Sequence, residues 1–157
     1  MKHLFPIIIA VLLCNCKKPN EVVAYNQIDF LNLQKSNATV KTIDTACINQ
    51  TRKANADIQR NRLTYFISDA ESFDSELQEL LKRYNIRLKS HSFSDIAAPE
   101  GFRNYCYENL MLEEILKRFG ENFLDSITKE AVKNYVINNP DKPYIESGRD
   151  LRELYLK

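Results

Sequence analysis

Four cysteines and two histidines are the residues of this chain best suited to chemistry. Cys47 and Cys106 form an even pair that could close a loop of about 60 residues and stabilise the fold by roughly 4 kcal/mol. Cys106 also falls on the apolar side of a predicted helix, where it could equally be a buried free thiol. Both interpretations stay open, because pairing depends on geometry. A nucleophilic Cys106 is disfavoured, since its neighbours Tyr105 and Tyr107 offer no base.

His91 is the single histidine outside the amino-terminal segment. It lies in a predicted strand, residues 86–93, in which Arg87 and Lys89 alternate with apolar residues, so we expect its imidazole to face water. One histidine and two distant cysteines match no recognised spacing of metal ligands. We therefore expect no metal site, no cofactor site and no catalytic residue.

Glu113 and Glu114 are adjacent carboxylates of the kind that acid–base chemistry uses. Each stands four residues before a base, Lys117 or Arg118, which is the favourable order for ion pairs on the outside of a helix. We expect these residues to be solvated charges, because no spacing in the chain selects a catalytic pair of carboxylates.

The first 15 residues have the pattern of a cleaved export signal. Lys2 precedes an apolar run from Leu4 to Leu13, which is too short to cross a bilayer core that needs roughly 20 apolar residues. The run ends at Cys14 and Cys16 and resembles a bacterial lipoprotein signal, in which the cysteine after the cleavage point is acylated. We assign lipidation to Cys16, with Cys14 as the alternative, because Leu13 then lies three residues before the acylated position.

The lipoprotein signal implies a location and a first partner. The N-terminal lipid would hold the mature chain on a membrane of the cell envelope. Acidic residues are missing directly after Cys16, although surface-displayed lipoproteins of the Bacteroidetes often carry them there. We therefore expect an outer-membrane protein that faces the periplasm.

Charge and composition exclude other partners. Removal of residues 1–15 takes away one basic residue, Lys2, and leaves 21 basic residues against 21 acidic ones. A chain without net charge has no field that attracts nucleic acid, so we expect no nucleic-acid partner. With only three glycines it also lacks a Gly-rich phosphate loop, and we expect no nucleotide cofactor.

Hydrophobic periodicity predicts one α+β domain over residues 38–157, preceded by a lipidated N-terminus and tether over residues 16–37. Helical spacing of apolar residues predicts helices over 45–60, 72–84, 101–120 and 122–138. Strand patterns at 63–67 and 86–93 enclose the second helix, which favours a βαβ unit. We expect a small sheet of two or three strands packed with three to four helices, with the helix 101–120 at the centre. The tail over 144–157 predicts a short strand or a helical turn.

Two segments suggest a family. Leu80-Leu81-Lys82-Arg83-Tyr84 is followed by a strand, and Ile115-Leu116-Lys117-Arg118-Phe119-Gly120 stands further on. Together they resemble the FEKKY domain, which occurs in lipoproteins and small exported proteins of Bacteroidetes. Leu80-Leu81 stands where that family has Phe-Glu. The resemblance covers roughly residues 55–135 and implies a class and a location, but it brings no catalytic residues.

These observations favour a lipid-anchored binding or interaction module with a protein partner in the envelope. Envelope immunity or inhibitor proteins share this size and anchor. The alternative is a small periplasmic hydrolase without a recognisable motif. An interaction protein should expose an apolar patch, whereas an enzyme should have a concave pocket with converging polar groups. A pocket around His91 or a carboxylate pair would contradict the interaction module.

Overall fold

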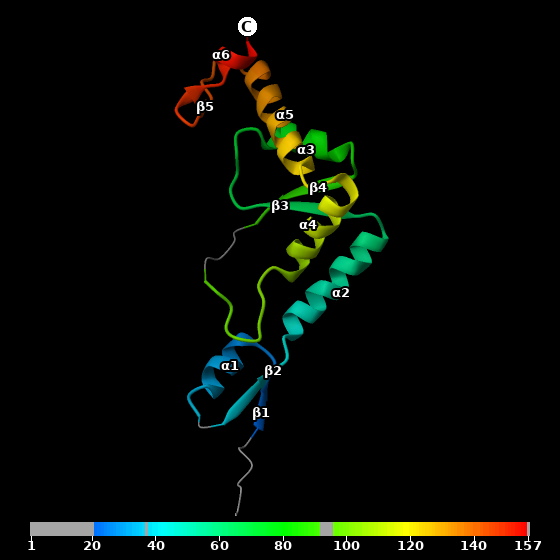
Figure 1. Ribbon diagram of the computed structural model, residues 1–157, viewed down its shortest axis with the longest axis vertical. Helices are drawn as coiled ribbons and strands as arrows, with labels where there is room; N and C mark the ends of the chain where they lie inside the picture. Colours follow the sequence, from blue (N-terminus) through cyan, green and yellow to red (C-terminus); the bar gives the residue numbers. More distant parts are fainter. Residues whose placement is uncertain (1–20, 37, 92–95, 157) are drawn as a thin grey trace, which may run out of the picture.

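The computed structural model describes residues 21–36, 38–91 and 96–156, so the predicted signal peptide with Cys14 and Cys16 lies outside the described residues. The molecule is elongated, with the first strand at one end and the carboxyl terminus at the other (Figure 1). Within the described residues, six helices and three two-stranded sheets form the fold. This confirms the predicted α+β class, although two short helices are added to the predicted three to four.

An N-terminal lobe is formed by the first three elements, which lie within or next to the range predicted to be a tether. The two strands pair in parallel, with Val22 opposite Val40, and Phe30 of the intervening helix packs against Phe102. Regular structure is therefore present in residues 21–36, which the sequence assigned to the tether. The strand pattern was ambiguous because each strand has only four residues. The elements are β1 (Glu21–Ala24), α1 (Gln27–Leu33) and β2 (Thr39–Thr42).

The central part of the molecule contains the βαβ unit that the sequence predicts. Its two strands pair in parallel, with Leu63 opposite Ile86, and the helix that connects them contributes Leu77 and Leu81 to the main core. The second strand ends at Ser90, before the predicted residue 93. The elements are α2 (Thr45–Gln59), β3 (Leu63–Ile67), α3 (Asp74–Lys82) and β4 (Ile86–Ser90).

The long central helix begins five residues later than the sequence predicts. It is α4 (Cys106–Phe119), and Gly101 and Tyr105 before it have positive φ angles of 83° and 59° that a continuous helix cannot contain. The sequence predicted an earlier helix start because Phe102 has the spacing of a buried helical residue. Phe102 is buried, but it packs into the core of the N-terminal lobe. Within α4, Met111 and Ile115 are fully buried, so its central packing role is confirmed.

The C-terminal part packs at the far end of the molecule (Figure 1). Helix α5 (Phe123–Asn138) lies chiefly against α3. The tail contains both alternatives that its sequence predicts, an antiparallel hairpin of β5 (Ile145–Glu146) and β6 (Arg149–Asp150) and then the short helix α6 (Arg152–Tyr155).

Candidate functional site

A disulfide joins the starts of α2 and α4. Cys47 is the third residue of α2 and Cys106 is the first residue of α4, with Cα atoms 5.4 Å apart. Both side chains are buried, at 2% and 6% exposure. Of the two alternatives that the sequence left open, the structure has the disulfide and not the free thiol.

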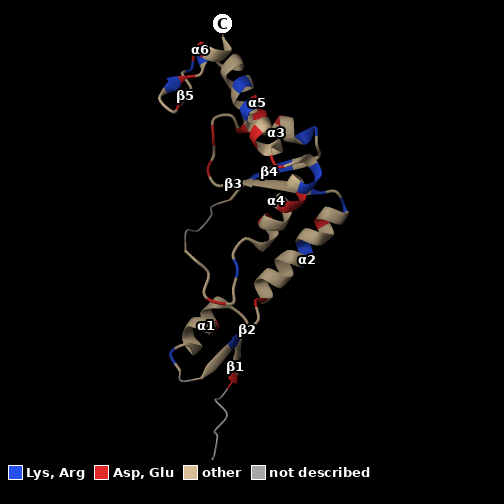
Figure 2. Ribbon diagram, viewed as in Figure 1, with Lys and Arg blue, Asp and Glu red and all other residues tan. Residues whose placement is uncertain are grey.

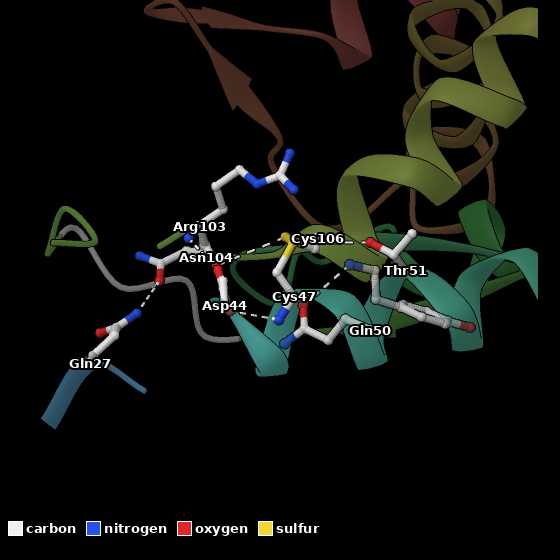
Figure 3. Close-up of a disulfide and its surroundings, with 9 residues drawn as sticks. Gln27, Asp44, Cys47, Gln50, Thr51, Arg103, Asn104 and Cys106 are labelled. Atoms are coloured by element: carbon white, nitrogen blue, oxygen red, sulfur yellow. Dashed lines mark hydrogen bonds between the residues drawn. A yellow bond between two sulfur atoms is a disulfide. The ribbon is translucent and has the colours of Figure 1, made fainter. Parts of the chain in front are cut away.

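Asp44 holds the same junction together by hydrogen bonds (Figure 3). Its Oδ1 accepts from the backbone N–H of Cys47 at 2.8 Å, which caps α2. Its Oδ2 accepts from the backbone N–H of Arg103 at 2.7 Å. Because Arg103 lies three residues before Cys106, the carboxylate and the disulfide fix the same turn against α2.

A cleft of about 620 Å³ opens beside this junction. The volume lies within the range of roughly 300 to 1,000 Å³ that is typical of ligand pockets. Its walls come from four segments, which are the start of α1, the start of α2, the end of β4 and the turn that leads into α4. The polar and aromatic side chains in these walls include Gln27, Gln50, His91, Asn104, Tyr105 and Glu108.

Amide side chains connect the two sides of the cleft. Gln27 donates from Nε2 to Oδ1 of Asn104 at 3.4 Å, and Asn104 donates from Nδ2 to the carbonyl of Ile96 at 3.0 Å. Gln50 accepts from the backbone N–H of Tyr107 at 3.3 Å through Oε1. Each amide has more donors and acceptors than these bonds use. These three amide side chains can therefore connect the walls of the cleft and also bind a polar ligand.

His91 and Glu108 face each other in the cleft. The His91 Nδ1 lies 3.9 Å from the Glu108 Oε1, and the two side chains are 38% and 15% exposed. The imidazole ring makes edge contacts with Tyr105 at 5.6 Å and with Phe66 at 6.1 Å between centroids. His91 is therefore partly exposed to water, as expected, but one side of its ring packs against aromatic side chains. Strand alternation does not set its direction, because β4 ends one residue earlier and aromatic rings hold the imidazole.

Glu108 is a carboxylate with unused hydrogen-bonding capacity. It lies in the first turn of α4, where the positive end of the helix dipole favours a negative charge. Its Oε2 is buried and has no hydrogen-bond partner among the described residues. A buried acceptor without a donor costs about 1 to 3 kcal/mol. The buried Oε2 therefore keeps an unused acceptor, whereas Oε1 is the oxygen that faces His91.

Tyr105 has a strained backbone at the edge of the cleft. Its φ of 59° and ψ of 32° lie in the left-handed region, which bulky side chains rarely adopt. Such conformations cost on the order of 1 to 3 kcal/mol and cluster at functional sites. Here the strained residue places its ring against His91, so the strain and the cleft coincide.

A separate polar cluster lies between α2 and α4. Tyr107 donates from its hydroxyl to Oδ2 of the buried Asp57 at 2.8 Å, and Arg62 forms an ion pair with Oδ1 of the same carboxylate. The Tyr107 hydrogen bond, followed by the Arg62 charge, lowers the pKa of Asp57 despite its burial. Burial and the contact with Asp57 raise the pKa of Tyr107. Because both carboxylate oxygens are satisfied, we assign this cluster a structural role.

The adjacent carboxylates of α4 lie away from the cleft. Glu114 pairs with Arg118 at 2.7 Å, as the sequence predicts, and it also contacts Lys117 at 3.8 Å. Glu113 is exposed. Arg118 reaches Asn61 as well, at 2.6 Å, so the pair helps to join α4 to the end of α2.

Sequence reasoning missed most of the cleft. Tyr105 and Glu108 flank Cys106 closely, and this position beside a cysteine was the one signal that could have identified them. Gln27 carried no signal, because its segment was assigned to the tether. Gln50 looks like an ordinary exposed residue of an amphipathic helix.

Two further findings concern the described residues alone. In that part of the chain, no three His, Cys, Asp or Glu side chains are grouped so that they could hold a metal ion. None of the helices described is long and apolar enough to cross a membrane.

Fold and site together define an α+β domain with a disulfide beside a polar cleft. Comparison with protein-family models, with curated proteins and with solved structures finds no match to this chain. The resemblance to the FEKKY domain therefore stays a prediction.

Proposed function

We propose that this chain is a lipid-anchored binding protein of the cell envelope, and that a small polar ligand occupies the cleft around His91 and Glu108. The observation that carries the proposal is the convergence of amide, imidazole and carboxylate groups on one concave site of about 620 Å³. By the criterion taken from the sequence, a pocket around His91 counts against the interaction module and is the feature expected of an enzyme; a binding site for a small molecule has the same concave geometry. The predicted protein partner thus gives way to a small ligand in this proposal.

The proposed location is the outer membrane, with the domain facing the periplasm. The lipoprotein-like signal with Cys16 supports the anchor. The buried Cys47–Cys106 disulfide supports an oxidising compartment, because disulfides persist outside the cytoplasm. Intact mass of the mature protein, which would show acyl groups on residue 16 and no residues 1–15, tests the anchor directly.

Native mass spectrometry of the lipoprotein released from envelopes in mild detergent tests the ligand site. We expect a noncovalent mass adduct on the wild-type chain and on Glu113→Gln, and its loss in Glu108→Gln. The two variants remove one negative charge from the same helix, but Glu113 is exposed on α4 whereas Glu108 lines the cleft. An adduct of equal abundance on all three proteins would place the ligand elsewhere, and bare protein in every case would contradict a tightly bound ligand.

A small hydrolase is the second candidate, and the His91–Glu108 pair favours it. An imidazole with a carboxylate 3.9 Å away can act as a general base once the two groups move into hydrogen-bond contact. In this candidate the base takes a proton from a water molecule, which attacks the substrate. A panel of chromogenic esters, glycosides and phosphate esters tests this candidate. Turnover that survives in Glu113→Gln and disappears in His91→Asn would support it, and no turnover above the His91→Asn level would contradict it.

A further inference from the structure

Helix α1 carries apolar side chains on opposite sides. Phe30 and Leu33 pack into the small core of the N-terminal lobe. Ile28 and Leu31 point the other way, about 60° apart at roughly 100° per residue, and are 72% and 51% exposed. Large apolar side chains that gather on an exposed surface often mark a site of contact with a partner or a membrane. The outer side of α1 therefore has the composition of a covered surface.

A basic residue follows the outer side of α1. Lys35 lies two residues beyond Leu33, in the turn after the helix. The other charged residues of the described part of this lobe are Glu21 in β1, Asp29 in α1 and Lys41 in β2, so charge is sparse and mixed in sign (Figure 2). An apolar stripe bordered by lysine is typical of helices that lie in the headgroup region of a membrane.

The lobe that contains α1 is also the part closest to the proposed anchor. β1 begins at Glu21, and Cys16 is five peptide units away. Five extended residues span at most about 18 Å. The sequence of this connection includes two basic residues, Lys17 and Lys18, which suit anionic headgroups. An anchor at Cys16 would therefore keep the N-terminal lobe beside the membrane.

We propose that the outer side of α1, formed by Ile28 and Leu31, lies against the membrane that holds the lipid anchor, with Lys35 in the turn that follows. This inference rests on the proposed anchor and adds a second contact with the bilayer. Tethering keeps α1 at a high effective concentration beside the lipid, so a few side chains suffice. The apolar groups leave water while Lys35 keeps its ammonium among the headgroups. Because Ile28 also lines the cleft, the contact brings the cleft close to the membrane surface.

Single tryptophan variants test this contact, because the chain contains no tryptophan of its own. The full lipidated chain with Leu31→Trp is reconstituted into phosphatidylcholine–phosphatidylglycerol vesicles with and without brominated acyl chains. Ile145→Trp is the control, since Ile145 is 61% exposed at the opposite end of the molecule (Figure 1). We expect at least twofold quenching and a blue shift of the Leu31→Trp emission, and neither for Ile145→Trp. Ile28→Trp gives a second reading if Leu31→Trp does not fold.

Vesicle flotation and intact mass measure the anchor independently of the contact. An acylated Leu31→Trp protein that floats but is quenched no more than Ile145→Trp overturns the contact and leaves the anchor in place. A blue shift that grows with the protein-to-lipid ratio, without bromine quenching, shows that a second copy covers α1 and also overturns it. A chain that neither floats nor carries acyl mass overturns the anchor and the contact together.

Discussion

Reduction of the Cys47–Cys106 disulfide should cost this chain about 4 kcal/mol of stability. The bond joins residues separated by 59 positions. The chain-entropy relation gives an entropy difference of about 14 cal/mol/K for a loop of this length, which is about 4 kcal/mol at 25 °C. For a domain of this size, such a loss corresponds to a decrease of roughly 10 to 15 °C in Tm. The segment closed by the disulfide contains β3, α3 and β4. When the bond is reduced, this segment gains conformational freedom in the unfolded chain, and the unfolded state is stabilised by that entropy.

Urea unfolding of the same protein with and without a phosphine reductant measures this loss. Because the same protein is measured in both states, only the disulfide bond differs between them. The double variant Cys47→Ala/Cys106→Ala is the control. Its free energy of unfolding should be lower than that of the oxidised wild type and should not change with the reductant. A difference below about 1 kcal/mol between oxidised and reduced wild type would refute the reasoning, because the bond would then restrain the unfolded chain very little.

Three further variants test the packing in the same assay. Ile115→Ala should cost about 2 to 5 kcal/mol, because Ile115 is fully buried in the core; near-neutral behaviour would argue against that packing. Gly101→Ala should cost at least about 1 kcal/mol, since φ is +83° and a Cβ would lie 1.9 Å from the Thr42 Oγ1; a variant of wild-type stability would contradict this. Tyr107→Phe removes the donor that most lowers the pKa of Asp57. The Asp57 contribution is present above its unfolded pKa, near 3.8, and is lost as pH falls through the lower folded pKa. Removal of the Tyr107 hydrogen bond brings the folded pKa of Asp57 closer to 3.8 and narrows this pH window. Tyr107→Phe should therefore be less stable at neutral pH and lose less stability on acidification than the wild type, and identical acid limbs would oppose the assignment.

The periodicity of apolar residues was sufficient to predict a helix or strand where the element is long and its apolar residues repeat regularly. Leu77 and Leu81 predict α3, and the run from Leu63 to Ile67 predicts β3. The parallel βαβ unit followed because two strands enclosed one helix. Patterning failed for β1, α1 and β2, because elements of four to seven residues contain too few positions to establish a period.

The start of α4 shows a different kind of failure. Phe102 has the spacing of a helical core residue, yet it packs against Phe30 in the other core. Periodicity shows that a residue is buried but does not show which partner covers it. The positive φ of Tyr105 also had no sequence signal, because such a conformation is held by its surroundings and not by the residue itself.

By itself, the sequence determined the α+β class, the main helices, the balanced charge, and the expectation of export and lipidation at Cys16. Each of these properties resides in contiguous residues or in composition. The tertiary structure alone decided that Cys47 pairs with Cys106 and that Gln27, His91 and Glu108 meet in one cleft. The physical reason is that these groups lie far apart along the chain, and their approach depends on how two cores and a shared junction pack together.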